Sequence, residues 1–139
     1  MEYEFNWTPD MSVGEKHLDE QHQGLLSQTN KIIDAIASGN HFNVVNETLS
    51  FYDKYINEHF VYEEEYMRKI GFPTISTHIE QHQGFINTYN LFKEKRIGGI
   101  PDRQLLVEFE AHIGDWWTEH ITKYDQQYHL FAETIRKQN

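Results

Sequence analysis

A five-residue sequence that contains a histidine occurs twice in this chain. Glu-Gln-His-Gln-Gly occupies residues 20–24 and again residues 80–84, so an offset of 60 residues superimposes His22 on His82. Imidazole is a common metal ligand. A single histidine on an apolar helical face nevertheless more often has a structural role. A metal site is therefore predicted only if further donors recur in step with the repeat.

Further donors do recur in the segment that follows each copy. An offset of 61 superimposes His59 on His120, and an offset of 62 superimposes Glu63 on Asp125. Each half of the chain thus supplies one histidine from a first segment, then a histidine and a carboxylate from a second. Two copies of one helical hairpin would bring such side chains together, and facing helices of a bundle commonly build dinuclear metal sites.

The second half carries one additional histidine. His78 lies four residues before His82, whereas Leu18 stands at the equivalent position of the first half. If both carboxylates and one solvent-derived oxygen bridge two metals, one metal has six donors, while the other has five and an open position. These donor types suit iron, although manganese or zinc could occupy the site. The predicted ligands are His22, His59, Glu63, His78, His82, His120 and Asp125.

Helix geometry supports most of these pairings. Residues four apart differ by only about 40° around an α-helix, so the donors spaced by four can share a site. His120 and Asp125 are five apart, which is about 140° around an ideal helix. We therefore expect an irregular turn near residues 122–125, with a short last helix restarting beyond it.

Apolar residues recur at helical spacing between clusters of helix-breaking residues. Helices of this length joined by short turns favour antiparallel neighbours, so we predict an all-α, up-down-up-down four-helix bundle. The chain is expected to be one domain, 1–139, with an N-terminal arm over 1–18 that lays Tyr3, Phe5 and Trp7 against the bundle. The bundle helices are predicted at 19–37, 42–69, 75–95 and 102–122, and the short C-terminal helix at 126–137.

The composition excludes several classes of partner. The formal net charge is −10, with 22 acidic against 12 basic residues, which argues against binding to nucleic acid or an anionic membrane. The sequence has no cysteine, so a metal must be held by His, Asp and Glu. Neither a signal peptide nor a membrane span is evident. We expect a monomeric, cytoplasmic protein.

Several polar residues stand outside the donor pattern. The acidic run continues through Glu64 and Glu65, which we interpret as a solvated face because only Glu63 has ligand spacing. The remaining histidines are interpreted as structural or surface residues: His17, His41, His112 and His129.

Four motifs together resemble the hemerythrin family. They are D-E-Q-H near the start, H-F-x-x-E-E-x-x-M, H-x-x-x-H-x-x-F, and W-x-x-x-H-I-x-x-x-D-x-x-Y. The resemblance covers nearly the whole chain, and the length and N-terminal tryptophan arm are similar to those of single-domain bacterial members. It implies a non-haem di-iron centre with a bridging oxo or hydroxo group. One iron would take His78, His82 and His120, the other would take His22 and His59, and Glu63 and Asp125 would bridge them.

The resemblance also implies reversible binding of dioxygen at the five-coordinate iron, for storage, delivery or scavenging. By position in the family pattern, the oxygen pocket would be lined by Leu25, Phe60, Trp117 and Ile121. Many members carry leucine where this chain has Trp117, whose larger indole could narrow or gate the pocket.

Two other functions are considered. A sensor would transmit a change at the metal centre to a protein partner, which the sequence does not identify. An oxidase, peroxidase or nitric oxide reductase is disfavoured, because oxygen-activating di-iron enzymes use carboxylate-rich sets with Glu-x-x-His pairs, and this set is rich in imidazole. We therefore do not expect an enzyme.

Overall fold

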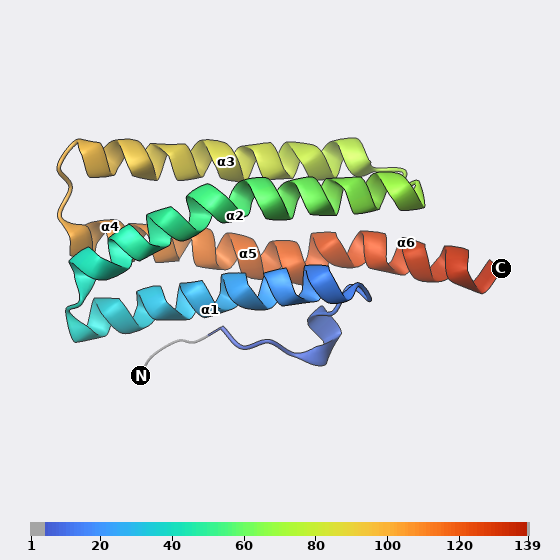
Figure 1. Ribbon diagram of the computed structural model, residues 1–139, viewed down its shortest axis with the longest axis horizontal. Helices are drawn as coiled ribbons and strands as arrows, with labels where there is room; N and C mark the ends of the chain where they lie inside the picture. Colours follow the sequence, from blue (N-terminus) through green and yellow to red (C-terminus); the bar gives the residue numbers. More distant parts are fainter. Residues whose placement is uncertain (1–4, 139) are drawn as a thin grey trace.

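A computed structural model describes residues 5–138, and these form an antiparallel bundle of four helical rods (Figure 1). The first three rods are α1 (Lys16–Ser38), α2 (His41–Ile70) and α3 (Ile75–Ile97). The fourth rod contains α4 (Asp102–Phe109), the π-helix η2 (Glu110–Gly114), α5 (Asp115–Glu119), the π-helix η3 (His120–Tyr124) and α6 (Asp125–Gln138). No strand is assigned within residues 5–138, which confirms the predicted all-α bundle.

The sequence provides capping residues at the start of α1 and at the ends of α1 and α2. The Glu15 side chain accepts hydrogen bonds from the backbone N–H groups of His17 and Leu18, which caps the start of α1. Gly39 follows α1 at φ 91°, and Gly71 follows α2 at φ 72°, so both adopt the left-handed conformation that glycine tolerates. These ends allow short reversals of the chain and hence antiparallel neighbours.

The fourth rod differs from the expected arrangement, and one difference is the π-helix η2, which interrupts the helix predicted over 102–122. The predicted irregular turn near residues 122–125 corresponds to the π-helix η3, and the expected last helix is present as α6. The rod is nevertheless unbroken, because the π-helix leads directly into α6 without a loop (Figure 1). Widening a helix by one residue per turn changes the direction of side chains without interrupting the backbone hydrogen bonds.

The N-terminal arm packs along the bundle as expected. Phe5 forms a pair of 2.8 Å hydrogen bonds with Asn30, one through its backbone N–H and one through its carbonyl oxygen. Its ring lies against Gly114, where an added Cβ would come within 3.1 Å of it. Trp7 is half-buried against the main apolar core. Tyr3, which was expected to share this role, lies outside the described residues.

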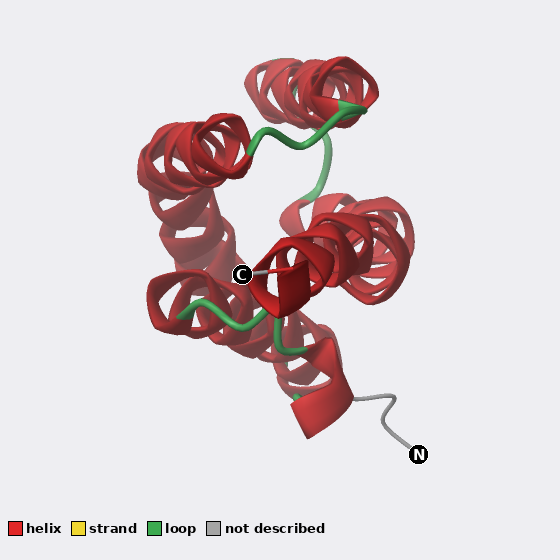
Figure 2. Cartoon of the chain, turned by 90° about the vertical axis from the view of Figure 1, so that its right-hand side faces the viewer, coloured by secondary structure: helices red, strands yellow, loops and turns green. Residues whose placement is uncertain are grey.

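The rods are arranged around a common interior (Figure 2). The core that fills it is divided into two apolar clusters. The larger cluster occupies the end near the α1–α2 turn and includes Leu25, Tyr52, Phe60, Phe85, Phe109, Trp117 and Ile121. The smaller cluster occupies the opposite end and consists of Val13, Leu18, Met67, Phe72 and Tyr128. Along each rod the predicted donors fall close to the boundary between these clusters. Among residues 5–138, no helix is long and apolar enough to cross a membrane.

Candidate metal centre

All seven predicted donors lie in one buried layer between the two apolar clusters. None exposes more than 3% of its surface. Burying ionisable groups is costly unless they are paired or hold a metal, so this layer requires a compensating interaction. The donors are His22 on α1, His59 and Glu63 on α2, His78 and His82 on α3, His120 in η3, and Asp125 at the start of α6.

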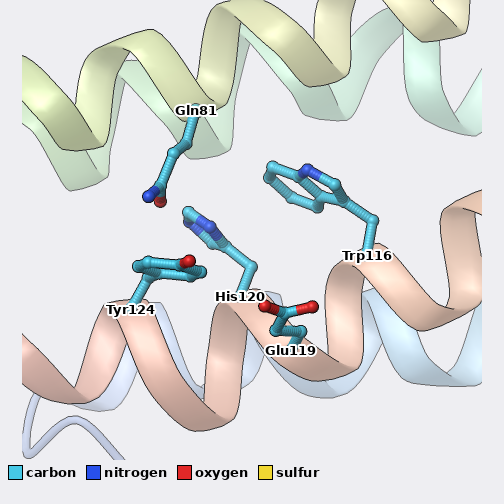
Figure 3. A pocket seen from close by; sticks show the side chains of 5 residues that line it. All are labelled: Gln81, Trp116, Glu119, His120 and Tyr124. Atoms are coloured by element: carbon cyan, nitrogen blue, oxygen red, sulfur yellow. The ribbon is translucent and has the colours of Figure 1, made fainter.

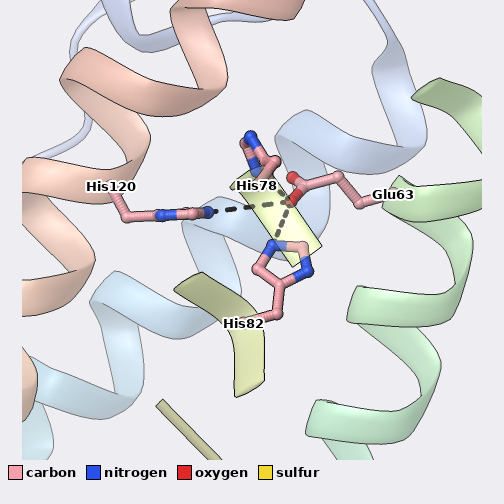
Figure 4. A group of neighbouring side chains, drawn as sticks. All are labelled: Glu63, His78, His82 and His120. Carbon is pink, nitrogen blue, oxygen red and sulfur yellow. Dashed lines mark hydrogen bonds and ion pairs between the residues drawn. The ribbon is translucent and has the colours of Figure 1, made fainter. Parts of the chain in front are cut away.

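The Glu63 carboxylate divides its two oxygens between two groups of histidines. Oε1 lies 2.8 Å from Nε2 of His82 and 3.2 Å from Nε2 of His78. Oε2 lies 3.3 Å from Nε2 of His22 and 3.6 Å from Nε2 of His59. Figure 4 shows the first group around Glu63, with His120 completing it.

The Asp125 carboxylate spans the same two groups. Oδ2 lies 3.1 Å from Nε2 of His22, and Oδ1 lies 3.0 Å from Nε2 of both His78 and His120. Both carboxylates thus place one oxygen beside the two-histidine group and the other beside the three-histidine group. This is the arrangement needed to bridge two cations.

The π-helix η3 makes the contribution of the fourth rod possible. The backbone N–H of Asp125 bonds to the carbonyl oxygen of His120, five residues earlier, instead of four. This wider turn returns the chain to the same side of the rod after five residues. His120 and Asp125 therefore face the same buried layer, which an ideal α-helix would not permit.

The donor atoms converge without satisfying one another. Nε2 of His59, His82 and His120 and both oxygens of Asp125 are buried, and none has hydrogen-bond geometry to any partner among the described residues. Hydrogen bonds require aligned donors and acceptors, whereas a cation at a common point satisfies several lone pairs at once. The residues present therefore fit a metal ion on each side of the carboxylates.

The ionisation of the layer without metal is consistent with this conclusion. Burial alone would raise the pKa of Glu63, but the neighbouring histidines lower it well below its usual value. Burial would lower the pKa of His22 and His78, yet contacts with Asp125 and Glu63 raise these values to about 10 and about 9. For His59, burial dominates and lowers the pKa to about 3. The two carboxylates thus favour positive charge in this layer, which is the charge that metal ions supply.

Outer residues hold two of the imidazoles through their second nitrogen. Nδ1 of His59 lies 2.7 Å from Oε1 of Gln21, and Nδ1 of His82 lies 2.9 Å from Oε2 of Glu64. Such contacts orient a metal-binding imidazole and select its tautomer. The interpretation of Glu64 as part of a solvated face is therefore wrong, because its carboxylate turns from α2 to the neighbouring α3.

Glu63 also receives a hydrogen bond from the fourth rod. The Tyr128 hydroxyl donates a 2.9 Å hydrogen bond to its Oε2. The sequence analysis did not select this tyrosine as a site residue, although it lies three residues after Asp125 and hence on a similar face of α6. Gln21 could also have been predicted as a site residue, because it belongs to the repeated five-residue sequence.

Aromatic rings fix the imidazoles from the sides. The Phe60 ring stacks on His82 at a centroid distance of 3.8 Å, and the Trp116 ring stacks on His120 at 4.4 Å. The four residues expected to line an oxygen pocket, Leu25, Phe60, Trp117 and Ile121, are all buried in the larger apolar cluster.

One edge of the site approaches the surface. Figure 3 shows the side chains of Gln81, Trp116 and Tyr124 around the His120 ring. Oε1 of Gln81 is buried there and has no hydrogen-bond partner in the described part of the chain. Gln81 occupies the position in the second five-residue copy that Gln21 occupies in the first. A cavity of about 190 Å³ at this edge is lined by Gln81, Trp116, Glu119, His120 and Tyr124.

Comparisons with known proteins identify the family. The family described as "Hemerythrin HHE cation binding domain" matches residues 13–132. The chain is 26% identical over 127 residues to a bacteriohemerythrin of Clostridium acetobutylicum, covering 89% of this chain and 98% of that protein. It is 29% identical over 111 residues to a bacteriohemerythrin of Methylococcus capsulatus, covering 79% and 82%. It is 30% identical over 84 residues to a myohemerythrin of Theromyzon tessulatum, covering 60% and 64%.

This chain therefore belongs to the hemerythrin family, as its motifs predicted. The family match and the buried cluster of histidines and carboxylates together indicate a non-haem metal site.

The contact between Glu64 and His82 can be tested by substitution. Replacing Glu64 with Gln removes the carboxylate that orients His82, and we expect metal affinity to fall by about 10–100-fold. Competition with a chelator of known affinity would measure the change. Glu65→Gln is the matched control, because Glu65 is exposed. Equal affinities of the two variants would contradict the assigned role of Glu64.

Proposed function

We propose that this chain holds a pair of non-haem iron ions, bridged by an oxo or hydroxo group, and binds dioxygen reversibly. The observation that carries the proposal is the unequal division of donors around Glu63 and Asp125. Three imidazoles lie on one side of the two carboxylates and only two on the other. His22 and His59 thus form the side that is one ligand short, and a small gas can occupy that position.

Each group of residues has a distinct task in this proposal. The first iron would be held by His78, His82 and His120, the second by His22 and His59, and both by Glu63 and Asp125. When bound, the iron pair supplies the electrons for reversible binding of dioxygen. The protein supplies ligands held in fixed orientations, which keeps the vacant position from closing.

The apolar cluster beside the two-histidine group supports reversibility. Leu25, Phe60, Trp117 and Ile121 are buried there and provide apolar contact surface. Water and protons promote the loss of reduced oxygen species from such a site, so excluding them protects the complex. We propose that these side chains form the wall of the oxygen pocket.

Storage, delivery or scavenging of dioxygen is favoured over catalysis. The buried layer contains five imidazoles and two carboxylates, unlike the carboxylate-rich sets of oxygen-activating di-iron enzymes. Sensing through a partner protein is the second candidate, and the cavity beside His120 is the feature that favours it.

Reconstitution with ferrous iron tests the proposed function. Oxygen admitted to the anaerobically loaded protein should produce near-ultraviolet and visible charge-transfer bands that disappear when oxygen is removed. Bands that form once and do not reverse would favour a sensor or redox role. A protein that shows no such bands after confirmed iron loading would not be an oxygen carrier.

The effect of Trp117 on the pocket is a separate prediction. Trp117 is 1% exposed and lies 5.8 Å from His59 between ring centroids. Leucine at this position would leave space that water can enter, so we expect Trp117→Leu to autoxidise faster than the unmodified protein. Stopped-flow and absorbance measurements would give the dissociation and autoxidation rates. Trp7→Leu, in the arm, is the control, and unchanged rates in Trp117→Leu would refute the predicted role.

A further inference from the structure

A column of packed aromatic rings connects the two-histidine side of the site to the surface. Trp117 lies 5.8 Å from His59 and 5.0 Å from Phe85, measured between ring centroids. Phe85 lies 5.8 Å from Tyr52, and Tyr52 lies 5.7 Å from Tyr89. The four aromatic residues beyond His59 are each no more than 2% exposed, so the rings pack in a continuous, dry path.

The column contains the two side-chain types that give up one electron most readily, tryptophan and tyrosine. A tyrosine that loses an electron must also lose its phenolic proton. A stable tyrosyl radical therefore forms only on a tyrosine whose hydroxyl has a proton acceptor beside it. The Tyr52 hydroxyl faces Thr29 and the Trp117 indole, and neither is a base. Tyr52 therefore cannot hold the oxidation, and an electron must tunnel past its ring.

Tyr89 has the base that Tyr52 lacks. Its hydroxyl donates a 2.7 Å hydrogen bond to Oδ1 of Asp53, and Nζ of Lys93 lies 2.9 Å from the same oxygen. Burial opposes ionisation of Asp53, but Lys93 and Tyr89 together outweigh it and lower the pKa of Asp53 below the usual value. Asp53 is therefore a carboxylate at neutral pH and can accept the proton of Tyr89.

The column ends in an open groove between α2 and α3. The Asp53 side chain is 51% exposed and that of Lys93 is 41% exposed, so a proton received there can pass to water. The groove has a volume of about 340 Å³, and its lining combines aromatic and apolar surface with polar groups. Its lining residues include Tyr52, Asp53, Ile86, Tyr89, Asn90 and Lys93.

We propose that this column carries oxidising equivalents from the metal centre to Tyr89, where a small phenol in the groove removes them. The oxidant is hydrogen peroxide, whose conversion to two molecules of water takes up two electrons and two protons. In each passage the O–H bond of Tyr89 breaks, its electron tunnels inward past Tyr52 and Phe85 to Trp117, and its proton moves to Asp53 and then to water. Two passages supply the two electrons that one peroxide takes up. The two protons that the peroxide takes up come from water and equal the two released through Asp53. A phenoxyl radical remains on Tyr89, and a phenol in the groove returns one electron and one proton to it.

Trp117 has a specific place in this proposal. It is the oxidisable ring beside His59, and a leucine in its place would break the column at its first step. The inference rests on the proposed iron site, because the oxidising equivalent arises there. The inference goes beyond oxygen binding, because the column would deliver electrons to the metal centre and so protect the buried ligands from oxidation.

The experiment is rapid freezing of the iron-loaded protein after mixing with hydrogen peroxide, followed by electron paramagnetic resonance. We expect an organic radical whose hyperfine pattern changes when the protein contains ring-deuterated tyrosine. Tyr89→Phe should lose this tyrosyl signal. Tyr62→Phe is the matched control, because Tyr62 lies outside the column, and its signal should equal that of the unmodified protein. Hydroquinone should shorten the lifetime of the radical.

The same samples separate this proposal from the proposed function. Each variant is first tested for folding by circular dichroism and for reversible oxygen bands. Intact bands without a tyrosyl radical, or with a radical that persists in Tyr89→Phe, would overturn the column and leave oxygen binding in place. If Tyr89→Phe does not fold, Asp53→Asn replaces it, since Asp53 is exposed. An undiminished radical in Asp53→Asn would then overturn the role of Tyr89.

Discussion

The structure depends on the negative charge of two carboxylates buried between apolar clusters. Glu63 and Asp125 are fully buried, and neither has a Lys or Arg as ion-pair partner among residues 5–138. Charges in such surroundings must be neutralised locally. Five imidazoles from all four rods converge on them, so the demand for positive charge determines how the rods face one another. A pair of cations between the carboxylates meets that demand with the fewest unsatisfied donors.

The remaining features of the bundle position this layer. The left-handed Gly39 and Gly71 allow the hairpin reversals, and the π-helix η3 turns His120 and Asp125 to the same side. Gln21 and Glu64 hold imidazoles from neighbouring rods. Such contacts between rods couple the geometry of the site to the packing of the bundle.

Much of this arrangement could be predicted from sequence because it follows from periodicity. The offset between His22 and His82, together with their partners, indicated which side chains the structure brings together. The five-residue spacing of His120 and Asp125 indicated a local irregularity, but spacing alone could not distinguish a broken helix from a widened turn. Glu64 was misinterpreted because its contact is made across to another rod, and sequence spacing describes directions around one helix only. The column from Trp117 to Tyr89 likewise depends on three rods and has no sequence pattern.

The central claim is that seven side chains hold two metal ions at unequal coordination. Iron K-edge X-ray absorption on protein loaded under anaerobic conditions tests it most directly, together with metal analysis of the same sample. The account predicts two irons per chain, scattering from a second iron close by, and an imidazole contribution averaging between two and three ligands per iron. A single iron per chain at saturation, or two irons without mutual scattering, would contradict it.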